Sequence, residues 1–238
     1  MTVLNPQFFH DQRAVPDAVG AALRAGTLIA LGSRSFAHGR GRSILCGVAG
    51  LMSSATVNQM ATHGRGLLSI AVDAKTAFRL GLRRMGGSAR GLPSKPEYLV
   101  SIEASACTGS GISASDRALT LRAAGAFEAN QEDLVTPGHI MPLLVRDALS
   151  PTATLPEIAH SIVAGNTPYA VAAWCDVLDD DGEVASLDGS ARLAETLAIP
   201  LFVPDENVAW PMGSAFFPGP GARRHAERID LFRFDQGS

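Results

Sequence analysis

Two separated side chains could move protons in this protein. His139 follows a Pro137-Gly138 turn, and Asp176 interrupts an otherwise apolar run over 169–178. An imidazole and a carboxylate make a workable pair for general acid–base catalysis. A carboxylate inside an apolar strand is costly unless it is paired or placed at a site. A structural role remains the alternative for His139, since a histidine after a turn is often only a satisfied polar group.

A basic, glycine-containing loop is predicted over residues 32–42, GSRSFAHGRGR, directly after a short apolar run. It carries His38, Arg40 and Arg42 and no acidic residue. Positive side chains on a loop that follows a strand could close over an anionic substrate and stabilise a developing oxyanion. A solvated surface loop without a ligand is the alternative.

Residues 104–124, ASACTGSGISASDRALTLRAA, combine small residues with hydroxyl groups at the start of an expected helix. Ser113 and Asp116 have the spacing of a capping box, and the apolar periodicity that follows predicts the helix itself. Because the first turn of a helix has unpaired N–H groups and a positive dipole end, it favours an anion. We expect a substrate-binding role here for Ser110, Ser113, Asp116 and Arg117. An ordinary tight loop with a good N-cap has the same local pattern.

Composition argues against several classes of protein. The 238 residues carry a formal charge of −3 and are 46% hydrophobic, which suffices for a sizeable core and disfavours a dedicated nucleic-acid binder. No apolar run is long enough to span a bilayer, and residues 1–13 do not read as a signal peptide. The three cysteines lack the spacing of a disulfide framework or a zinc site. We expect a cytoplasmic protein of one domain, residues 1–238, with a C-terminal extension over 211–238.

The order of the expected elements indicates an α/β or α+β sandwich, with a mixed β-sheet flanked by helices. Apolar patterns predict strands over 27–31, 66–72, 98–104, 169–178 and 201–203. Helical spacing and caps predict helices over 16–24, 54–63, 73–85, 113–124, 155–165 and 190–198. Composition predicts loops over 86–96 and 131–139 and a helical turn over 205–210.

Four segments together resemble the 3,4-dihydroxy-2-butanone 4-phosphate synthase family of riboflavin biosynthesis. In chain order they read IEA at 102–104, GISASDR at 111–117, PGHIMPL at 137–143 and CDVLDDDG at 175–182. The resemblance spans residues 15–210 and implies a mixed-sheet α/β fold and a homodimer with sites near the subunit interface. It also implies a Mg²⁺-dependent lyase that converts ribulose 5-phosphate into formate and a four-carbon phosphate. By the same resemblance His139 is the acid–base histidine, Asp176 stands for a catalytic glutamate, and Thr136 and Cys175 belong to the substrate site.

The chain departs from that family where the family binds its metal ion. The acidic segment that follows the first strand in the family is here the basic loop, so that Arg42 stands about where an aspartate is expected. Leu155 stands where the family has its metal-binding histidine. Because Mg²⁺ prefers oxygen ligands in an octahedral array, neither side chain can replace the residue it stands for. We therefore expect no metal and no other cofactor, and we expect ribulose 5-phosphate conversion to be lost.

Two hypotheses for the function follow. In the first, His139 and Asp176 move protons on a carbonyl-containing or anionic small molecule, in metal-independent lyase, isomerase or cyclase chemistry of secondary metabolism. In the second, the chain is a catalytically inactive paralogue that binds a ligand or a partner subunit. An authentic 3,4-dihydroxy-2-butanone 4-phosphate synthase is the least favoured. The charged Asp176 in an apolar strand favours the enzyme, because a purely structural descendant has no need of that charge.

Overall fold

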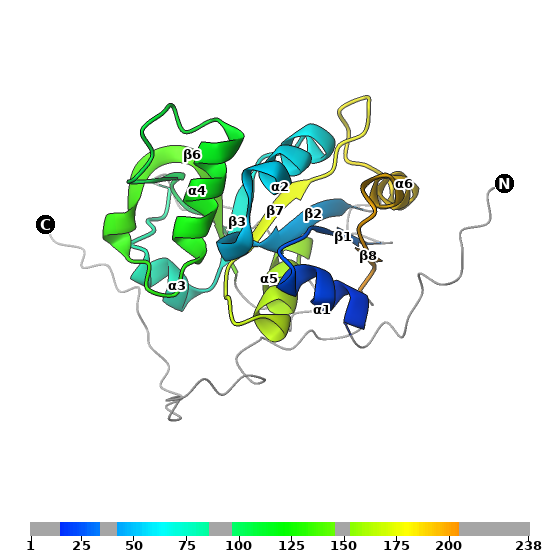
Figure 1. Ribbon diagram of the computed structural model, residues 1–238, viewed down its shortest axis with the longest axis horizontal. Helices are drawn as coiled ribbons and strands as arrows, with labels where there is room; N and C mark the ends of the chain where they lie inside the picture. Colours follow the sequence, from blue (N-terminus) through cyan, green and yellow to red (C-terminus); the bar gives the residue numbers. More distant parts are fainter. Residues whose placement is uncertain (1–14, 34–41, 86–96, 146–152, 205–238) are drawn as a thin grey trace, which may run out of the picture.

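A mixed β-sheet runs through the centre of the molecule, with helices on both of its faces (Figure 1). The computed structural model describes residues 15–33, 42–85, 97–145 and 153–204. Within these ranges the sheet has eight strands. Seven of them follow the order β4-β6-β3-β7-β2-β1-β8, and β5 pairs with β6 off this path. The predicted fold class is confirmed.

The strands are β1 (Ile29–Gly32), β2 (Ser43–Val48), β3 (Ser69–Val72), β4 (Glu97–Tyr98), β5 (Ile102–Ala104), β6 (Leu134–Leu144), β7 (Ala172–Asp176) and β8 (Leu201–Phe202). Strands β1, β2 and β3 are buried along their whole length, as expected for near-continuous apolar runs that are covered on both faces. Strand β3 pairs in parallel with β6 and antiparallel with β7, whereas β2 is antiparallel to both of its neighbours.

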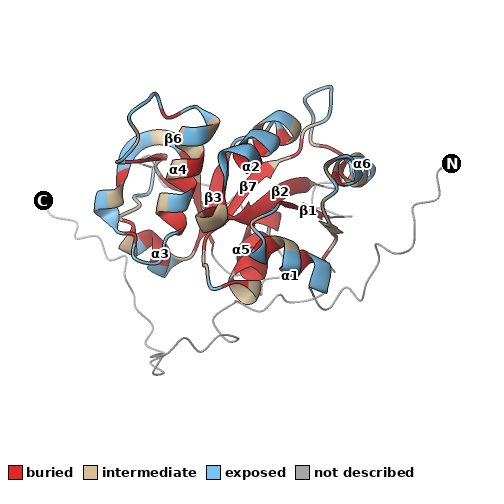
Figure 2. Cartoon of the chain, in the orientation of Figure 1, coloured by how far each residue is buried: buried red, intermediate tan, exposed pale blue. Residues whose placement is uncertain are grey.

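The helices are α1 (Asp17–Arg24), α2 (Ser54–Gln59), α3 (Ala74–Arg79), α4 (Ala114–Gly125), α5 (Leu155–Asn166) and α6 (Leu187–Leu197). Val19 of α1 and Ile162 of α5 belong to the core on one face of the sheet. Val57 of α2 and Leu121 of α4 belong to the core on the other face, and the buried residues lie between these layers (Figure 2). Within the described ranges, no helix combines the length and the apolar character that crossing a bilayer requires.

Local capping explains where two of these helices begin. The Ser113 hydroxyl accepts a hydrogen bond from the Asp116 N–H at 3.0 Å, which fixes the start of α4. At α5 the Glu157 carboxylate accepts from the Thr154 N–H at 2.8 Å in a capping box, and a proline occupies the first turn. The cap predicted at Ser113 therefore acts through such a bond, whereas the capping box at Thr154 was not predicted.

Several predicted elements need correction. The loop predicted over 131–139 is wrong beyond residue 133, because β6 begins at Leu134 after a short 3₁₀ turn, Gln131–Asp133. The strand predicted over 98–104 divides into β4 and β5, and β2 was not predicted. The helix predicted over 73–85 ends at Arg79. The segments 34–41, 86–96 and 205–210 lie outside the described residues, and they include His38 and Arg40 of the predicted basic loop.

Candidate functional site

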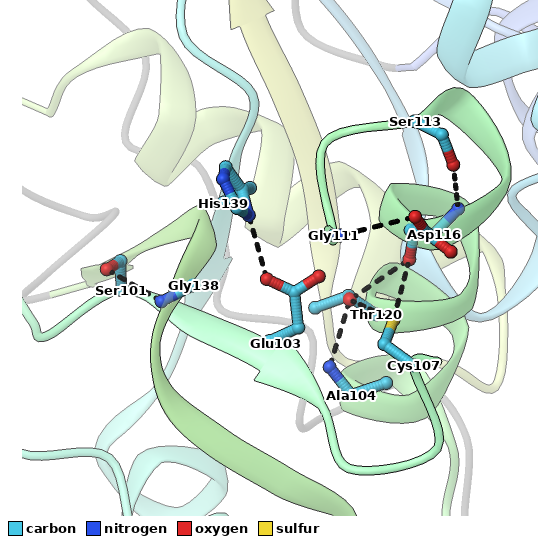
Figure 3. A network of polar contacts seen from close by, with 10 residues as sticks. All are labelled: Ser101, Glu103, Ala104, Cys107, Gly111, Ser113, Asp116, Thr120, Gly138 and His139. Atoms are coloured by element: carbon cyan, nitrogen blue, oxygen red, sulfur yellow. Dashed lines mark hydrogen bonds and ion pairs between the residues drawn. The ribbon is translucent and has the colours of Figure 1, made fainter. Parts of the chain in front are cut away.

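His139 is hydrogen-bonded to a buried carboxylate. Its Nδ1 lies 2.8 Å from Oε2 of Glu103, which reaches it from the neighbouring strand β5 (Figure 3). The His139 side chain is 41% exposed, whereas that of Glu103 is only 11% exposed. Because an ionised carboxylate can only accept, the Nδ1 of a neutral imidazole must carry the proton in this bond. The other ring nitrogen is then the basic one.

The pairing of β5 with β6 brings these two side chains together. Ile102 lies opposite Ile140, but the register shifts at the next residue, so that Glu103 lies opposite Val135. Gly138 sits at this irregularity, and its N–H donates to the Ser101 hydroxyl at 3.1 Å (Figure 3). A Cβ at Gly138 would lie 2.1 Å from the Ile102 carbonyl, so only glycine allows β6 to pass this close to β5. Pro137 and Gly138, predicted as a turn, are part of β6, and the close approach at Gly138 helps to position the histidine.

The loop before α4 closes over Glu103 from the other side. The Gly111 N–H donates to the Asp116 carboxylate at 3.2 Å, so Asp116 holds this loop instead of completing a capping box at Ser113 (Figure 3). The Ser113 hydroxyl is engaged as the N-cap and also contacts Ser115 at 2.8 Å. Ser110 is exposed. Ser113 thus serves the helix start, and the substrate-binding role of Ser110 and Ser113 stays a prediction.

A second charged pair joins β2 and β7. Arg42, just before β2, places Nη2 2.8 Å from Oδ1 of Asp176, the last residue of β7. The two side chains are 39% and 21% exposed. A guanidinium has five N–H donors, so one bond to Asp176 leaves donors for an anionic ligand. Arg42, which was predicted as part of the basic loop, therefore lies next to Asp176.

The sheet register places both pairs at the same end of the sheet. Met141 of β6 pairs with Ser69 of β3, and Ser69 pairs with Trp174 of β7. His139 lies two residues before Met141 in β6, and Asp176 lies two residues after Trp174 in the antiparallel β7. One strand, β3, separates β6 from β7. The register therefore places the two predicted proton-transfer residues toward the same end of the sheet.

Tyr98 is a further polar side chain near this end of the sheet. Burial raises the pKa of its phenol, the negative charge of Asp176 raises it further, and the positive charge of Arg42 lowers it. The hydroxyl therefore lies within electrostatic range of the Arg42–Asp176 pair and stays protonated near neutral pH. We did not single out Tyr98 from the sequence, where it is only the second residue of a short strand.

The remaining predicted site residues lie around these pairs in different environments. Thr136 is exposed on β6 and precedes a cis peptide bond to Pro137. Arg117 on α4 is half-buried, and its charge lowers the pKa of the Cys175 thiol, although burial raises that pKa to about 12. Cys175 has no exposed surface. Its predicted contact with substrate does not fit this geometry, because the thiol points into the core.

At two positions that the resemblance assigns to the magnesium site, Arg42 and Leu155, the described residues offer no oxygen ligand. Within the described ranges, no group of three or more His, Cys, Asp or Glu side chains is placed to hold a metal ion. Leu155 is 2% exposed and packs in the core at the first turn of α5. Arg42, at the position of an expected aspartate, instead brings a cation to Asp176. Neither side chain offers an oxygen ligand.

A separate cavity of about 440 Å³ lies away from these residues, between α6 and the chain that leads into β8. Its lining is mostly alanine and larger aliphatic side chains, with the carboxylates of Asp188 and Glu195. Neither His139 nor Asp176 lines it. The proton-transfer residues and this cavity are therefore separate features.

Glu103 is the functional residue that the sequence reasoning missed. It lies between Ile102 and Ala104 in a strand buried along its length. The argument used for Asp176, that a carboxylate in an apolar strand needs a partner, applies equally to Glu103. What the sequence could not supply was the partner, because 36 residues separate Glu103 from His139.

Comparisons with known proteins identify the family to which this sequence is similar. The model of the family described as 3,4-dihydroxy-2-butanone 4-phosphate synthase matches residues 18–208. The synthase of Desulfovibrio desulfuricans is 33% identical over 168 residues, which cover 66% of this chain and 72% of that protein. That of Neisseria meningitidis serogroup A is 34% identical over 140 residues, which cover 58% of this chain and 38% of that protein. The chain spans less than half the length of several such relatives.

Solved structures show the same fold. RibBX, a two-domain 3,4-dihydroxy-2-butanone 4-phosphate synthase from A. baumannii, superposes with a TM-score of 0.69 at 25% identity, covering 78% of this chain and 54% of that one. A 3,4-dihydroxy-2-butanone 4-phosphate synthase in complex with two magnesium ions superposes with a TM-score of 0.69 at 22% identity, covering 78% of this chain and 90% of that one. From the family model and these likenesses together, the chain belongs to the 3,4-dihydroxy-2-butanone 4-phosphate synthase family.

Proposed function

We propose that this chain is a lyase- or isomerase-type enzyme of its family that moves protons on a small, negatively charged carbonyl compound without using a metal ion. His139 is the general base, and Asp176 is a second proton-transfer group. The Arg42 guanidinium supplies positive charge near the reacting oxygen. The observation that carries this proposal is the pair of short contacts, His139–Glu103 and Arg42–Asp176, at one end of the sheet.

The geometry of His139 suits a general base. Its side chain is 41% exposed, so a ligand can reach the ring, and Nδ1 is already bonded to Glu103. The opposite nitrogen, Nε2, is therefore the one that can remove a proton from a carbon next to a carbonyl group. A proton lost from such a carbon leaves an enolate, whose oxygen needs a positive partner.

Arg42 can supply that positive partner. Its side chain is 39% exposed while it binds Asp176, so its other donors can meet a carboxylate, phosphate or enolate oxygen. The family resemblance implies that magnesium supplies this positive charge in other members. The residues at the corresponding positions here, Leu155 and Arg42, carry no oxygen ligand for a magnesium ion. A fixed guanidinium also needs no change of protonation during the reaction, which suits it to this task.

Authentic synthase activity is the second candidate. It is favoured by the match of the family model over residues 18–208. This candidate would need a metal ion held by residues that include the segment 34–41, which lies outside the described residues. The two candidates differ in one measurable product, because the synthase reaction releases formate and simple proton transfer does not.

We also propose that two copies of the chain associate. The family resemblance implies a homodimer, and three apolar side chains close to the site residues in sequence are exposed: Leu67 by 57%, Ile112 by 55% and Val135 by 48%. Exposed apolar side chains of this size are common at contacts between subunits. Light scattering on the purified full chain tests this association, and a monomer at all concentrations would contradict it.

The test of function follows proton exchange in D₂O by ¹H NMR. The full chain, treated with EDTA, is incubated with ribulose 5-phosphate and, in separate samples, with dihydroxyacetone phosphate. We expect the carbon-bound protons beside the carbonyl to exchange faster than in buffer, with no formate released. His139→Gln, whose folding is checked by urea unfolding, should remove this exchange.

Two other outcomes are informative. Formate that appears only with Mg²⁺ would establish the second candidate and overturn the metal-independent one. Absence of exchange with both phosphates, in a folded wild-type chain that binds them, would argue for a ligand-binding protein and against the proposed enzyme.

A further inference from the structure

Glu103 is a buried carboxylate in the middle of an apolar strand. It is 9% exposed, and its neighbours Ile102 and Ala104 are exposed by only 0% and 2%. Burying a carboxylate costs several kcal/mol unless a partner compensates for the lost hydration. The burial therefore calls for a specific role, because an apolar residue would suit this strand better.

Glu103 makes one strong polar contact. Its Oε2 lies 2.8 Å from His139 Nδ1, and its Oε1 is buried without a hydrogen-bond partner within the described ranges. Burial raises the pKa of the nearby Cys107 thiol, Thr120 lowers it by a hydrogen bond, and a hydrogen-bonding contact with Glu103 raises it, together with the negative charges of Glu103 and Asp116. The thiol therefore stays neutral, and His139 and Cys107 are the two titratable side chains beside the Glu103 carboxylate, with the short 2.8 Å bond going to His139.

Gly111 leaves the space that this carboxylate occupies. A Cβ at Gly111 would lie 1.8 Å from Glu103 Oε1, and the backbone there has a φ of +82°, which favours glycine. Gly138 acts on the backbone instead, because a Cβ there would lie 2.4 Å from the Glu103 N and 2.1 Å from the Ile102 carbonyl. The loop before α4 therefore packs against the carboxylate of Glu103, and β6 packs closely against the backbone of β5 just before His139.

We propose that Glu103 is a positioning residue that holds His139 with its proton on Nδ1, so that Nε2 faces the substrate as the base. This inference rests on the proposed function of His139. The carboxylate accepts the Nδ1–H bond, fixes the plane of the ring and stabilises the imidazolium that forms when Nε2 takes a proton from the substrate. The carboxylate itself transfers no proton.

Other charged and titratable groups face this pair from the elements packed around it. Asp116 approaches from α4 through the Gly111 N–H, and the Cys107 thiol lies in the loop between β5 and α4 (Figure 3). Within the described ranges, neither group is hydrogen-bonded to the imidazole ring. The carboxylate of Glu103 is therefore the charged group in direct contact with the ring.

The test compares Glu103→Gln with Glu97→Gln in the full chain. Glu97 is a matched control, because it also forms an ion pair on a neighbouring strand, 2.7 Å from Arg84, and it does not contact His139. The first measurement is the ¹⁵N NMR spectrum of the His139 ring, assigned by loss of its signals in His139→Gln. We expect the Nδ1–H tautomer in the wild type and in Glu97→Gln, and a mixture of tautomers in Glu103→Gln.

The second measurement is the rate of proton exchange on ribulose 5-phosphate at pH 7. Glu103→Gln should lower that rate about 10- to 100-fold, as is typical when a partner that orients a histidine is lost. Glu97→Gln should leave the rate unchanged.

The failure of this inference can be told apart from failure of the proposed function. An Nε2–H tautomer in the wild type, or an unchanged tautomer and exchange rate in Glu103→Gln, would overturn the positioning role even if the enzyme is active. If no exchange occurs with any variant, the proposed function fails, and the NMR tautomers still decide whether Glu103 orients the ring.

Discussion

Gly111 is the position where one added methyl group tests the geometry around Glu103. Its φ is +82°, and a Cβ there would lie 1.8 Å from Glu103 Oε1. Gly182 has nearly the same φ, +80°, but a Cβ at that position meets nothing within 4 Å. The two glycines form a matched pair, because alanine imposes similar backbone strain at both positions and a collision only at Gly111.

The expected magnitudes follow from these two contributions. Gly182→Ala should lower the free energy of unfolding by about 1–2 kcal/mol, the cost of an alanine in the left-handed region. Gly111→Ala must also displace the Glu103 carboxylate, which breaks a charge-assisted hydrogen bond with His139 that is worth about 1.5–3 kcal/mol. The loss for Gly111→Ala is then about 3–5 kcal/mol.

Urea unfolding at pH 7 measures both losses, with an unchanged dependence on urea concentration as the check that the unfolded states are comparable. The ¹⁵N spectrum of His139 should change in Gly111→Ala and stay as in the wild type in Gly182→Ala. Equal destabilisation by the two substitutions, with the same histidine spectrum, would refute the close packing of Gly111 against Glu103.

Three further predictions concern other parts of the chain. Arg42→Gln should lower the free energy of unfolding by no more than about 1 kcal/mol, because the pair with Asp176 is partly exposed, and the loss should shrink in 1 M NaCl; a salt-independent loss would contradict this ion pair. Ser113→Ala should cost about 1 kcal/mol through loss of the cap of α4, whereas Ser113→Asn should retain most of the stability in the same urea assay. Burial lowers the pKa of His160 below its ordinary value, against the opposing effects of Asp73 and the Ala170 carbonyl, so the unfolded chain binds the proton more tightly than the folded one. The contribution of neutral His160 to the free energy of unfolding is therefore complete above about pH 6.5 and is lost as the pH falls below that value. His160→Leu should reduce the fall in the free energy of unfolding between pH 7 and pH 5, measured by urea unfolding.

Local patterns were enough to predict much of the fold. The cap at Ser113 marked the start of α4 because its hydrogen bond joins residues that are three apart in the chain. The capping box at Thr154 has the same local spacing but was not recognised from the sequence. The buried strands β1, β3 and β7 follow from short apolar runs. By contrast, β6 was taken for a loop up to residue 139, because its proline and glycine are typical of turns and its strand bonds go to distant residues.

The sequence by itself determined which residue types are available for chemistry: an imidazole after a Pro-Gly turn, a carboxylate in an apolar strand and a basic segment. Only the tertiary structure decided their partners, joining His139 to Glu103 across 36 residues and Arg42 to Asp176 across 134. The physical reason is that strand pairing brings together residues whose separation in the chain is not encoded in any local pattern. An imidazole becomes a directed base only when such a distant carboxylate fixes which of its nitrogens carries the proton.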